Sequence, residues 1–226
     1  MLANLSNWLD ERFGWRSVWE TIFRRKIPKV NWFYTLGSAT LFVAVLQAVT
    51  GILLTLYYVP SPDQAYASVQ FITYELPAGW FIRGIHHYGA SAMVILVVLH
   101  MLRVIFYGAY KFPREMTWIT GALLLLIVVG FGFTGYLLPW DQKAYWATTV
   151  GTRIAGTAPL IGDFILRVMR GGQELSEVTL ARFFGVHVWV LPTLLFSLIG
   201  IHLYLIIRLG ISAPPKKGEN KGDSHE

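Results

Sequence analysis

Long uncharged, apolar stretches alternate with charged segments along this chain. Four windows contain no Asp, Glu, Lys or Arg, namely residues 30–62, 84–102, 116–140 and 183–207. A helix needs about 20 apolar residues to cross the hydrocarbon core of a bilayer, and each window is close to that length or longer. The pattern therefore predicts an all-α integral membrane protein, a bundle of four transmembrane helices over residues 32–58, 80–107, 115–137 and 182–209.

The segments that flank this bundle domain, residues 32–212, have a different composition. In residues 1–31, aromatic residues alternate with arginine and lysine, which is typical of an amphipathic surface helix at the headgroup boundary. Residues 213–226 are polar and charged, which predicts a disordered tail. The connections 63–79 and 139–181 are expected to lie at the membrane surface.

Composition excludes several classes of protein. With 54% hydrophobic residues and a mean hydropathy of +0.49 over 226 residues, the chain is not an ordinary soluble domain. The lack of cysteine excludes disulfides, cysteine-ligated clusters or zinc, and haem attached through thioether bonds. The net charge of +6 comes from basic residues that flank the spans, so it indicates membrane topology rather than nucleic-acid binding.

Lysine and arginine are distributed unequally between the two sides of the predicted bundle. Thirteen of the 19 lie in the N-terminal segment, between the second and third helices, or at and beyond the C-terminal end of the fourth helix. By the positive-inside rule, both termini are cytoplasmic. The second and fourth helices consequently run in parallel, from the electrically positive side of the membrane to the negative side.

Four histidines lie at matched depths on these two parallel helices. His86 and His100 are 14 residues apart, and His187 and His202 are 15 residues apart. At about 1.5 Å per residue each pair spans about 21–23 Å, and rotations of about 40° and 60° keep each pair on one side of its helix. His86 should therefore face His187, and His100 should face His202. Two facing imidazoles are the axial ligands of a six-coordinate b-type haem.

Other uses of these histidines remain open at this point. A single intramembrane histidine is more often a hydrogen-bonded packing residue, although four of them in register favour a function because ionisable groups in a membrane are costly. His87 is rotated about 140° away from the side that carries His100, and we interpret it as a neighbour rather than a ligand. A transporter or channel with a histidine proton relay is the alternative, and it would show no b-type absorption band.

Four glycines repeat the same interval on the other two helices. Gly37 and Gly51 are 14 residues apart on the first helix, as are Gly121 and Gly135 on the third. Because these helices run in the opposite direction, Gly51 and Gly135 fall at the level of one histidine pair, and the other two fall at the level of the second. Glycine leaves room for a porphyrin edge beside the backbone. Ordinary close packing of helices is the alternative.

Three arginines near the ends of the spans are candidates for binding haem propionates. Arg83 precedes His86 on the positive side, whereas Arg103 and Arg114 lie on the negative side. The alternative interpretation is that these side chains only snorkel to the interface and set the topology.

Four short stretches carry a resemblance to a known family. They read RGIHHYGAS at 83–91, FPREMTW at 112–118, GYLLPWDQ at 135–142 and RFFGVH at 182–187. They closely resemble the cytochrome b family of quinol oxidoreductases that work with a Rieske iron–sulfur protein, in the short split form of cytochrome bf-type complexes. The resemblance implies two non-covalent b-type haems: His86 and His187 ligate the low-potential one, on the positive side, and His100 and His202 ligate the high-potential one.

The resemblance also implies a function. The chain would be the electron-transfer subunit of a quinol:cytochrome c (or equivalent acceptor) oxidoreductase, inactive alone, which passes electrons from quinol to quinone on the negative side and couples this to proton translocation in a Q cycle. The implied partners are a separate subunit IV-like chain with the C-terminal half of cytochrome b, the Rieske protein, a c-type cytochrome and a second copy of the complex. The implied location is the bacterial inner (plasma) membrane, with a photosynthetic membrane as the alternative.

Two positions depart from the pattern of the family. Thr35 stands where bf-type relatives have a cysteine that tethers an extra haem, and Ile207 stands where a basic residue is usual. A covalent extra haem is therefore excluded. We expect Tyr34, Thr35 and Arg208 to form a quinone site instead.

The aromatic residues after the third helix have two interpretations of equal weight. Trp140 and Tyr145 lie in the stretch GYLLPWDQKAYW, which resembles part of the quinol-oxidising pocket of the family. The alternative is an aromatic belt at the membrane interface.

A dihaem membrane anchor of a formate dehydrogenase or hydrogenase is the runner-up function. Such anchors also have four helices and bis-histidine haems, but their ligand arrangement does not give four aligned intervals of 14 or 15 residues. Co-purification with a Rieske protein, or with a formate- or hydrogen-oxidising subunit, distinguishes the two.

Overall fold

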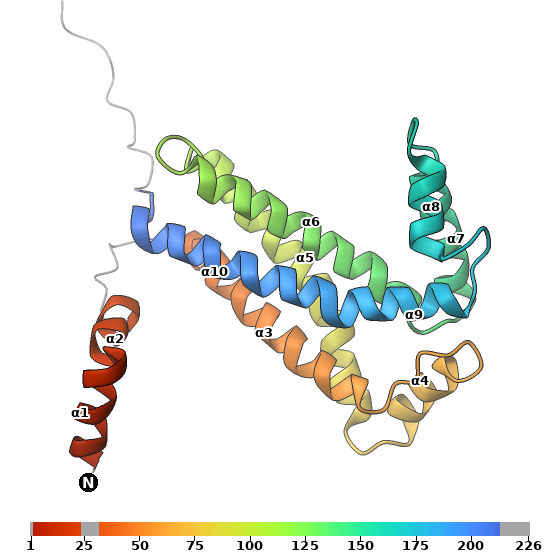
Figure 1. Cartoon of the computed structure of the whole chain (residues 1–226), viewed down its shortest axis with the longest axis horizontal. Helices are drawn as coiled ribbons and strands as arrows, with labels where there is room; N and C mark the ends of the chain where they lie inside the picture. The colour runs from red at the N-terminus through yellow and green to blue at the C-terminus, as the bar shows by residue number, and fades with distance from the viewer. Residues whose placement is uncertain (1, 24–31, 213–226) are drawn as a thin grey trace, which may run out of the picture. The chain divides into compact units, whose positions relative to one another are not determined.

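The computed structural model describes residues 2–23 and 32–212, which form helices and connecting turns with no strand among them (Figure 1). These residues belong to two compact units, residues 1–34 and residues 35–226. The predicted tail, residues 213–226, and the basic residues at 24–29 lie outside the described residues.

The N-terminal unit contains two helices where the sequence predicted one. These are α1 (Leu2–Phe13) and α2 (Trp15–Phe23), and they are separated by Gly14, whose φ of +58° is a left-handed conformation that favours glycine. The indole nitrogen of Trp15 donates to the carbonyl of Ser6 at 2.9 Å, which holds the second helix to the first. Several tryptophans and Phe13 are exposed.

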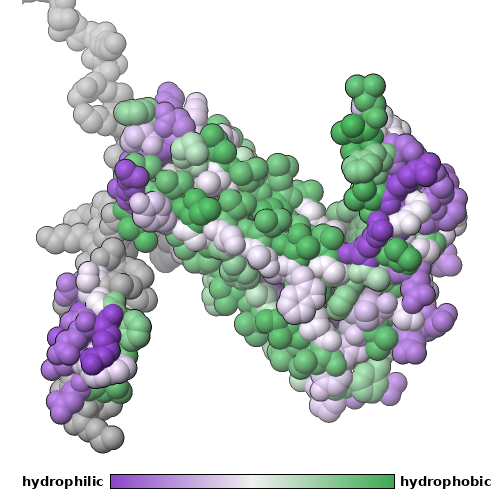
Figure 2. Space-filling model, viewed as in Figure 1, coloured by the Kyte–Doolittle hydropathy of each residue, from purple (hydrophilic) through white to green (hydrophobic). Residues whose placement is uncertain are grey.

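Four spans are long and apolar enough to cross a membrane, as predicted. They are α3 (Leu36–Thr55), preceded by the 3₁₀ turn Trp32–Thr35; α5 (Gly79–Phe106); α6 (Glu115–Leu137); and the continuous helix formed by α9 (Glu177–Gly185), the π-helical segment Val186–Val190 and α10 (Leu191–Leu209). The surface over these spans is largely hydrophobic, and hydrophilic residues gather at their two ends (Figure 2).

Local sequence explains where the spans begin and end. The fourth span begins at Glu177, earlier than predicted, because Ser176 and Thr179 form a capping box. Its last helix ends before Gly210, which has a φ of +73° and donates its N–H to Ile206 at 2.9 Å. The first span is helical only to Thr55, and two prolines follow within seven residues.

The middle of the bundle is a purely apolar layer. Helix α3 packs on α5, and α6 packs on α10 (Figure 1). The buried residues at the centre come from all four spans, namely Ala44, Met93, Val97, Val128 and Leu195. Ala44, Met93 and Val128 lie midway between the paired glycines or histidines of their helices, and Leu195 lies within one residue of that point. The layer therefore separates the two levels at which the histidines lie.

Three further helices form the connections. They are α4 (Ala65–Tyr74), α7 (Gln142–Gly156) and α8 (Gly162–Arg170). Helices α7 and α8 pack together at one end of the spans (Figure 1). Arg170, which is 2% exposed, joins them by donating to the Thr152 hydroxyl at 2.8 Å and to the Thr149 carbonyl at 2.9 Å. A third donation, to the Gln173 carbonyl at 2.7 Å, fixes the turn after α8.

Candidate functional site

The first level of the site contains His86 on α5 and His187 in the π-helical segment. Their ring centroids are 6.4 Å apart, and the ring planes are inclined by 73°. Both residues are partly buried. The ring of Phe131 packs edge-on against His187, with 5.3 Å between ring centroids. One metal atom fits between two rings at this separation, since metal–imidazole bonds are about 2 Å long.

The second level contains His100 on α5 and His202 on α10. Each ring faces a glycine of a neighbouring span, Gly37 in the case of His100 and Gly121 in the case of His202. Both are partly buried, on the far side of the apolar layer from His86 and His187. The structure therefore brings the histidines together as two pairs.

Each of the four glycines faces one of these imidazoles. A Cβ atom added at Gly135 would lie 2.6 Å from Cε1 of His187, and one at Gly51 would lie 3.2 Å from Cε1 of His86. At the second level, the corresponding distances are 3.1 Å from Gly37 to His100 and 3.3 Å from Gly121 to His202. This is the register expected from the 14-residue intervals. The neighbour that the structure shows at each glycine is a histidine ring, whereas the sequence argument assigned the space to a porphyrin edge.

Threonine hydroxyls contact three of the histidines. In Thr50, Oγ1 lies 3.0 Å from Nδ1 of His86. In Thr134 it lies 2.9 Å from Nδ1 of His187, and in Thr120 it lies 2.9 Å from Nδ1 of His202. Sequence analysis missed these threonines. The signal was present, because each stands directly before one of the four glycines as a Thr-Gly pair.

A wide helical turn lies at His187. The N–H of Leu191 bonds the carbonyl of Val186, five residues earlier, in place of the usual four. Pro192, which lacks an N–H and crowds the carbonyl four residues before it, follows this turn directly. A π turn accommodates one additional residue. The 15-residue interval from His187 to His202 therefore matches the 14-residue interval on α5 more closely than a regular α-helix allows.

The donor set fits haem rather than a bare metal ion. Within the described ranges, no group of three or more His, Cys, Asp or Glu side chains is arranged to hold a metal. A pair of imidazoles completes the coordination of an iron whose other four ligands belong to a porphyrin. The histidines, the glycine clearances and the apolar surroundings thus fit two haems, one at each level.

The three candidate arginines lie at the ends of the spans. Arg83 is one turn before His86 on α5 and is partly buried. The guanidinium of Arg103 lies 5.1 Å from the ring centre of Tyr107. Arg114 donates from Nε to the carbonyl of Gly210 at 3.2 Å, so it ties the start of α6 to the end of α10.

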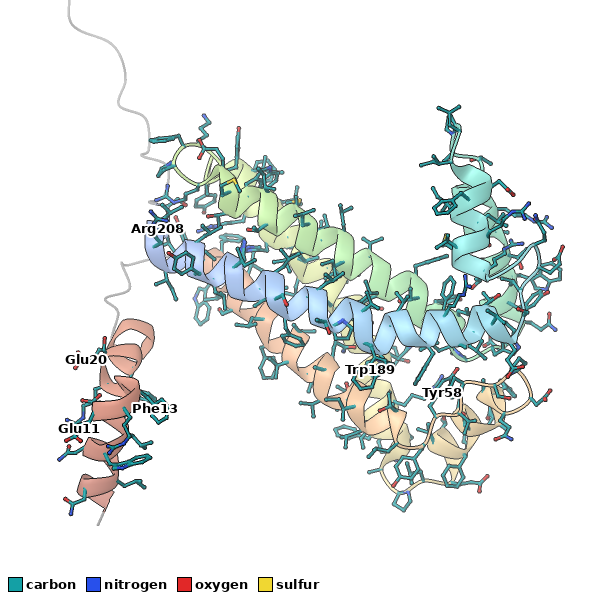
Figure 3. All side chains as sticks on the ribbon, viewed as in Figure 1. Glu11, Phe13, Glu20, Tyr58, Trp189 and Arg208 are labelled. Carbon is teal, nitrogen blue, oxygen red and sulfur yellow. The ribbon has the colours of Figure 1, made fainter. Side chains whose placement is uncertain are left out.

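The candidate quinone residues are not gathered in one described pocket. Arg208 is exposed in the last turn of α10, at the opposite end of the bundle from Tyr58 (Figure 3). Thr35 is exposed directly before α3, and Tyr34 belongs to the N-terminal unit.

The two aromatic residues after α6 contact each other, with 5.9 Å between ring centroids. Trp140 also packs on a second buried cluster, Ala65, Leu137, Leu180 and Phe183, and therefore contributes to packing whatever else it does. His87 is exposed beside Tyr88, 5.1 Å away between ring centroids.

Comparisons with known proteins agree with this geometry. Residues 23–210 match the family described as Cytochrome b/b6/petB. The chain is 45% identical over 223 residues to the menaquinol:cytochrome c reductase cytochrome b subunit of Geobacillus thermodenitrificans, and 43% identical to that of Bacillus subtilis (strain 168). Each alignment covers 95% of this chain and 100% of the relative. The chain is also 40% identical to cytochrome b6 of Synechococcus elongatus, over 94% of this chain and 100% of the relative.

A solved structure shares the fold. The structure named hyperthermophilic respiratory Complex III matches with a TM-score of 0.84 and 36% identity, covering 96% of this chain. The chain spans 58% of the length of that solved chain. The fold, the paired histidines and the family match over most of the sequence agree, and the chain belongs to the cytochrome b family, whose members bind b-type haem and transfer electrons within membranes.

Proposed function

We propose that the chain is the transmembrane electron-transfer subunit of a quinol:cytochrome c, or equivalent acceptor, oxidoreductase. The single observation that carries this proposal is the placement of the four histidines at two levels of one bundle, with the His86 and His187 rings facing each other at one level and His100 and His202 on the far side of the apolar layer. Relatives named as menaquinol:cytochrome c reductase subunits support the substrate class. Membership of the cytochrome b family favours this function over a formate dehydrogenase or hydrogenase anchor.

Each histidine pair holds one haem, with His86 and His187 on the positive side and His100 and His202 on the negative side. When bound, the haems supply one-electron oxidation and reduction across the membrane. The protein holds the imidazoles in place through the Thr hydroxyls and leaves space for their rings at the glycines. The apolar layer excludes water between the two levels.

Arginines at the span ends bind the haem propionates in this proposal. Arg83 serves the positive-side haem, and Arg103 and Arg114 serve the negative-side haem. The contact from Arg114 Nε to Gly210 leaves the two Nη groups of that side chain for a carboxylate.

Quinone and quinol bind at opposite ends of the bundle. Thr35 and Arg208 contribute to the quinone site on the negative side, and Trp140 and Tyr145 contribute to the quinol site on the positive side. Electrons thus pass from the positive to the negative side, coupled to proton translocation in a Q cycle.

The complex resides in the inner membrane of a bacterium, with both termini in the cytoplasm. The described basic residues that support this orientation include Arg103, Lys111, Arg114 and Arg208. The partners are a subunit IV-like chain, a Rieske protein and a c-type cytochrome, in a homodimeric complex. Affinity purification of the tagged chain in mild detergent should recover these proteins together with bound quinone.

Neighbouring histidines give a direct test of the ligand assignment. We expect the purified wild-type complex to contain two b-type haems per chain, measured from the reduced-minus-oxidised spectrum and the extracted haem content. His86→Ala should lose the positive-side haem, whereas His87→Ala should keep both because its ring is exposed beside Tyr88. Two intact low-spin haems in His86→Ala would disprove the assignment.

A further inference from the structure

The Thr-Gly pairs are distributed unequally over the four histidine positions. Thr50 precedes Gly51, Thr120 precedes Gly121 and Thr134 precedes Gly135, but Leu36 precedes Gly37. The glycine facing His100 is packed as tightly as two of the others, with 3.1 Å between the added Cβ and Cε1. The position before it carries a larger, wholly apolar side chain and so offers no hydroxyl group to His100.

The direction of the threonine hydrogen bonds follows from proton counting. Thr50 Oγ1 lies 2.7 Å from the carbonyl of Leu46 and Thr134 Oγ1 lies 2.8 Å from that of Gly130, so each hydroxyl donates its one proton to its own helix. Thr120 does the same at 3.0 Å from Met116. Toward the imidazole, each oxygen can therefore only accept a hydrogen bond.

The tautomer of three histidines is fixed as a consequence. Nδ1 carries the proton and donates it to the threonine oxygen, and Nε2 keeps its lone pair for a metal.

Hydrogen bonding at Nδ1 also affects the iron. A bond donated from Nδ1 raises the electron density at Nε2, and a stronger donor stabilises ferric over ferrous iron. His86 and His187 each donate to a threonine, whereas only His202 does so at the second level. The first level therefore has two hydroxyl acceptors and the second has one.

We propose that Thr50, Thr134 and Thr120 are positioning residues that lower the potential of the haem they serve, and that Leu36 leaves the His100 level with one fewer of them. The haem between His86 and His187 is then the lower in potential, and electrons move downhill toward His100 and His202. This proposal rests on the proposed function, because it requires a haem at each level.

Redox titration of the purified complex tests the proposal, with each haem followed by its α-band and by its low-spin electron paramagnetic resonance signal. Thr134→Val should raise the midpoint of the His86/His187 haem by the equivalent of about tenfold in its oxidised-to-reduced ratio, or about 59 mV. The midpoint of the His100/His202 haem should not shift. Thr134→Ser keeps the hydroxyl and should restore the wild-type value.

Leu36→Thr provides the converse test, because it places a hydroxyl at the position that corresponds to Thr50, Thr120 and Thr134 and leaves the His86/His187 level unchanged. We expect it to lower the midpoint of the His100/His202 haem alone. The proposal is overturned if Thr134→Val shifts the midpoint of neither haem or shifts both midpoints equally, or if Thr134→Ser and Thr134→Val give the same midpoints. A wild-type complex without two haems would instead overturn the proposed function.

Discussion

The contact between Gly135 and His187 makes the sharpest structural prediction. In Gly135→Ala, the new Cβ would lie 2.6 Å from Cε1 of His187, whereas ordinary van der Waals contact begins at 3.4 Å. The imidazole ring must therefore retreat by about 0.8 Å, more than the tolerance of about 0.5 Å within which ligand geometry must be held. Phe131 packs on the same ring and hinders this movement.

The expected cost is that of overpacking a well-filled site, about 1–3 kcal/mol, which corresponds to a loss of haem affinity of roughly 5- to 150-fold. The measurement is the haem content and reduced-minus-oxidised spectrum of the purified variant, followed by haem loss to an excess of an apo-haem acceptor protein. We expect only the haem of the His86/His187 level to be lost or altered.

Two glycines on α6 supply matched controls. Gly132→Ala meets nothing within 4 Å and should bind both haems normally, since alanine favours the helix. Gly121→Ala, with a distance of 3.3 Å to His202, should have a smaller effect than Gly135→Ala. Wild-type haem affinity and spectrum in Gly135→Ala would refute the packing argument.

Two further predictions concern the connections around the bundle. Arg170→Met should destabilise the packing of α8 on α7 by about 3 kcal/mol, because it removes two buried hydrogen bonds and one partly buried hydrogen bond from a charged group, and thermal unfolding in detergent measures this. Arg167→Gln breaks only an exposed ion pair and should lower the stability by less than about 1 kcal/mol. An equal loss of stability in both variants would contradict the role of Arg170 in holding α8 to α7. Tyr58 lies beyond the end of α3 and donates to the carbonyl of Leu138 at 2.6 Å, and burial raises the pKa of its phenol above the ordinary value. In the unfolded chain the Tyr58 phenol ionises near pH 10, whereas in the folded chain it keeps its proton at that pH. The contribution of the buried phenol to the free energy of unfolding is therefore complete below about pH 10 and is lost as the pH rises further. Tyr58→Phe should weaken that alkaline decline in stability, and an unchanged decline would argue against a role for this phenol.

The sequence predicted the architecture because membrane spans are encoded locally. Runs of apolar residues fix the four spans to within a few positions, and the all-α fold follows from them. The family, which the comparisons confirm, was predicted from the four short stretches at 83–91, 112–118, 135–142 and 182–187. The fourth span starts earlier than predicted because the side chain of Ser176 caps it. The N-terminal segment forms two helices where one was predicted because the backbone turns at Gly14. The ligand roles of the histidines and arginines stay predictions.

By itself, the sequence determined the number of spans, the histidine pairs and the register of histidine with glycine, since intervals of 14 and 15 residues translate directly into depth along a helix. Only the tertiary structure showed that Thr50, Thr120 and Thr134 bond to histidines on other helices, and that the turn at Val186–Val190 is a π turn. These features depend on contacts between residues 36 to 82 positions apart and on how a proline follows a wide turn. Periodicity along one helix carries no information about either.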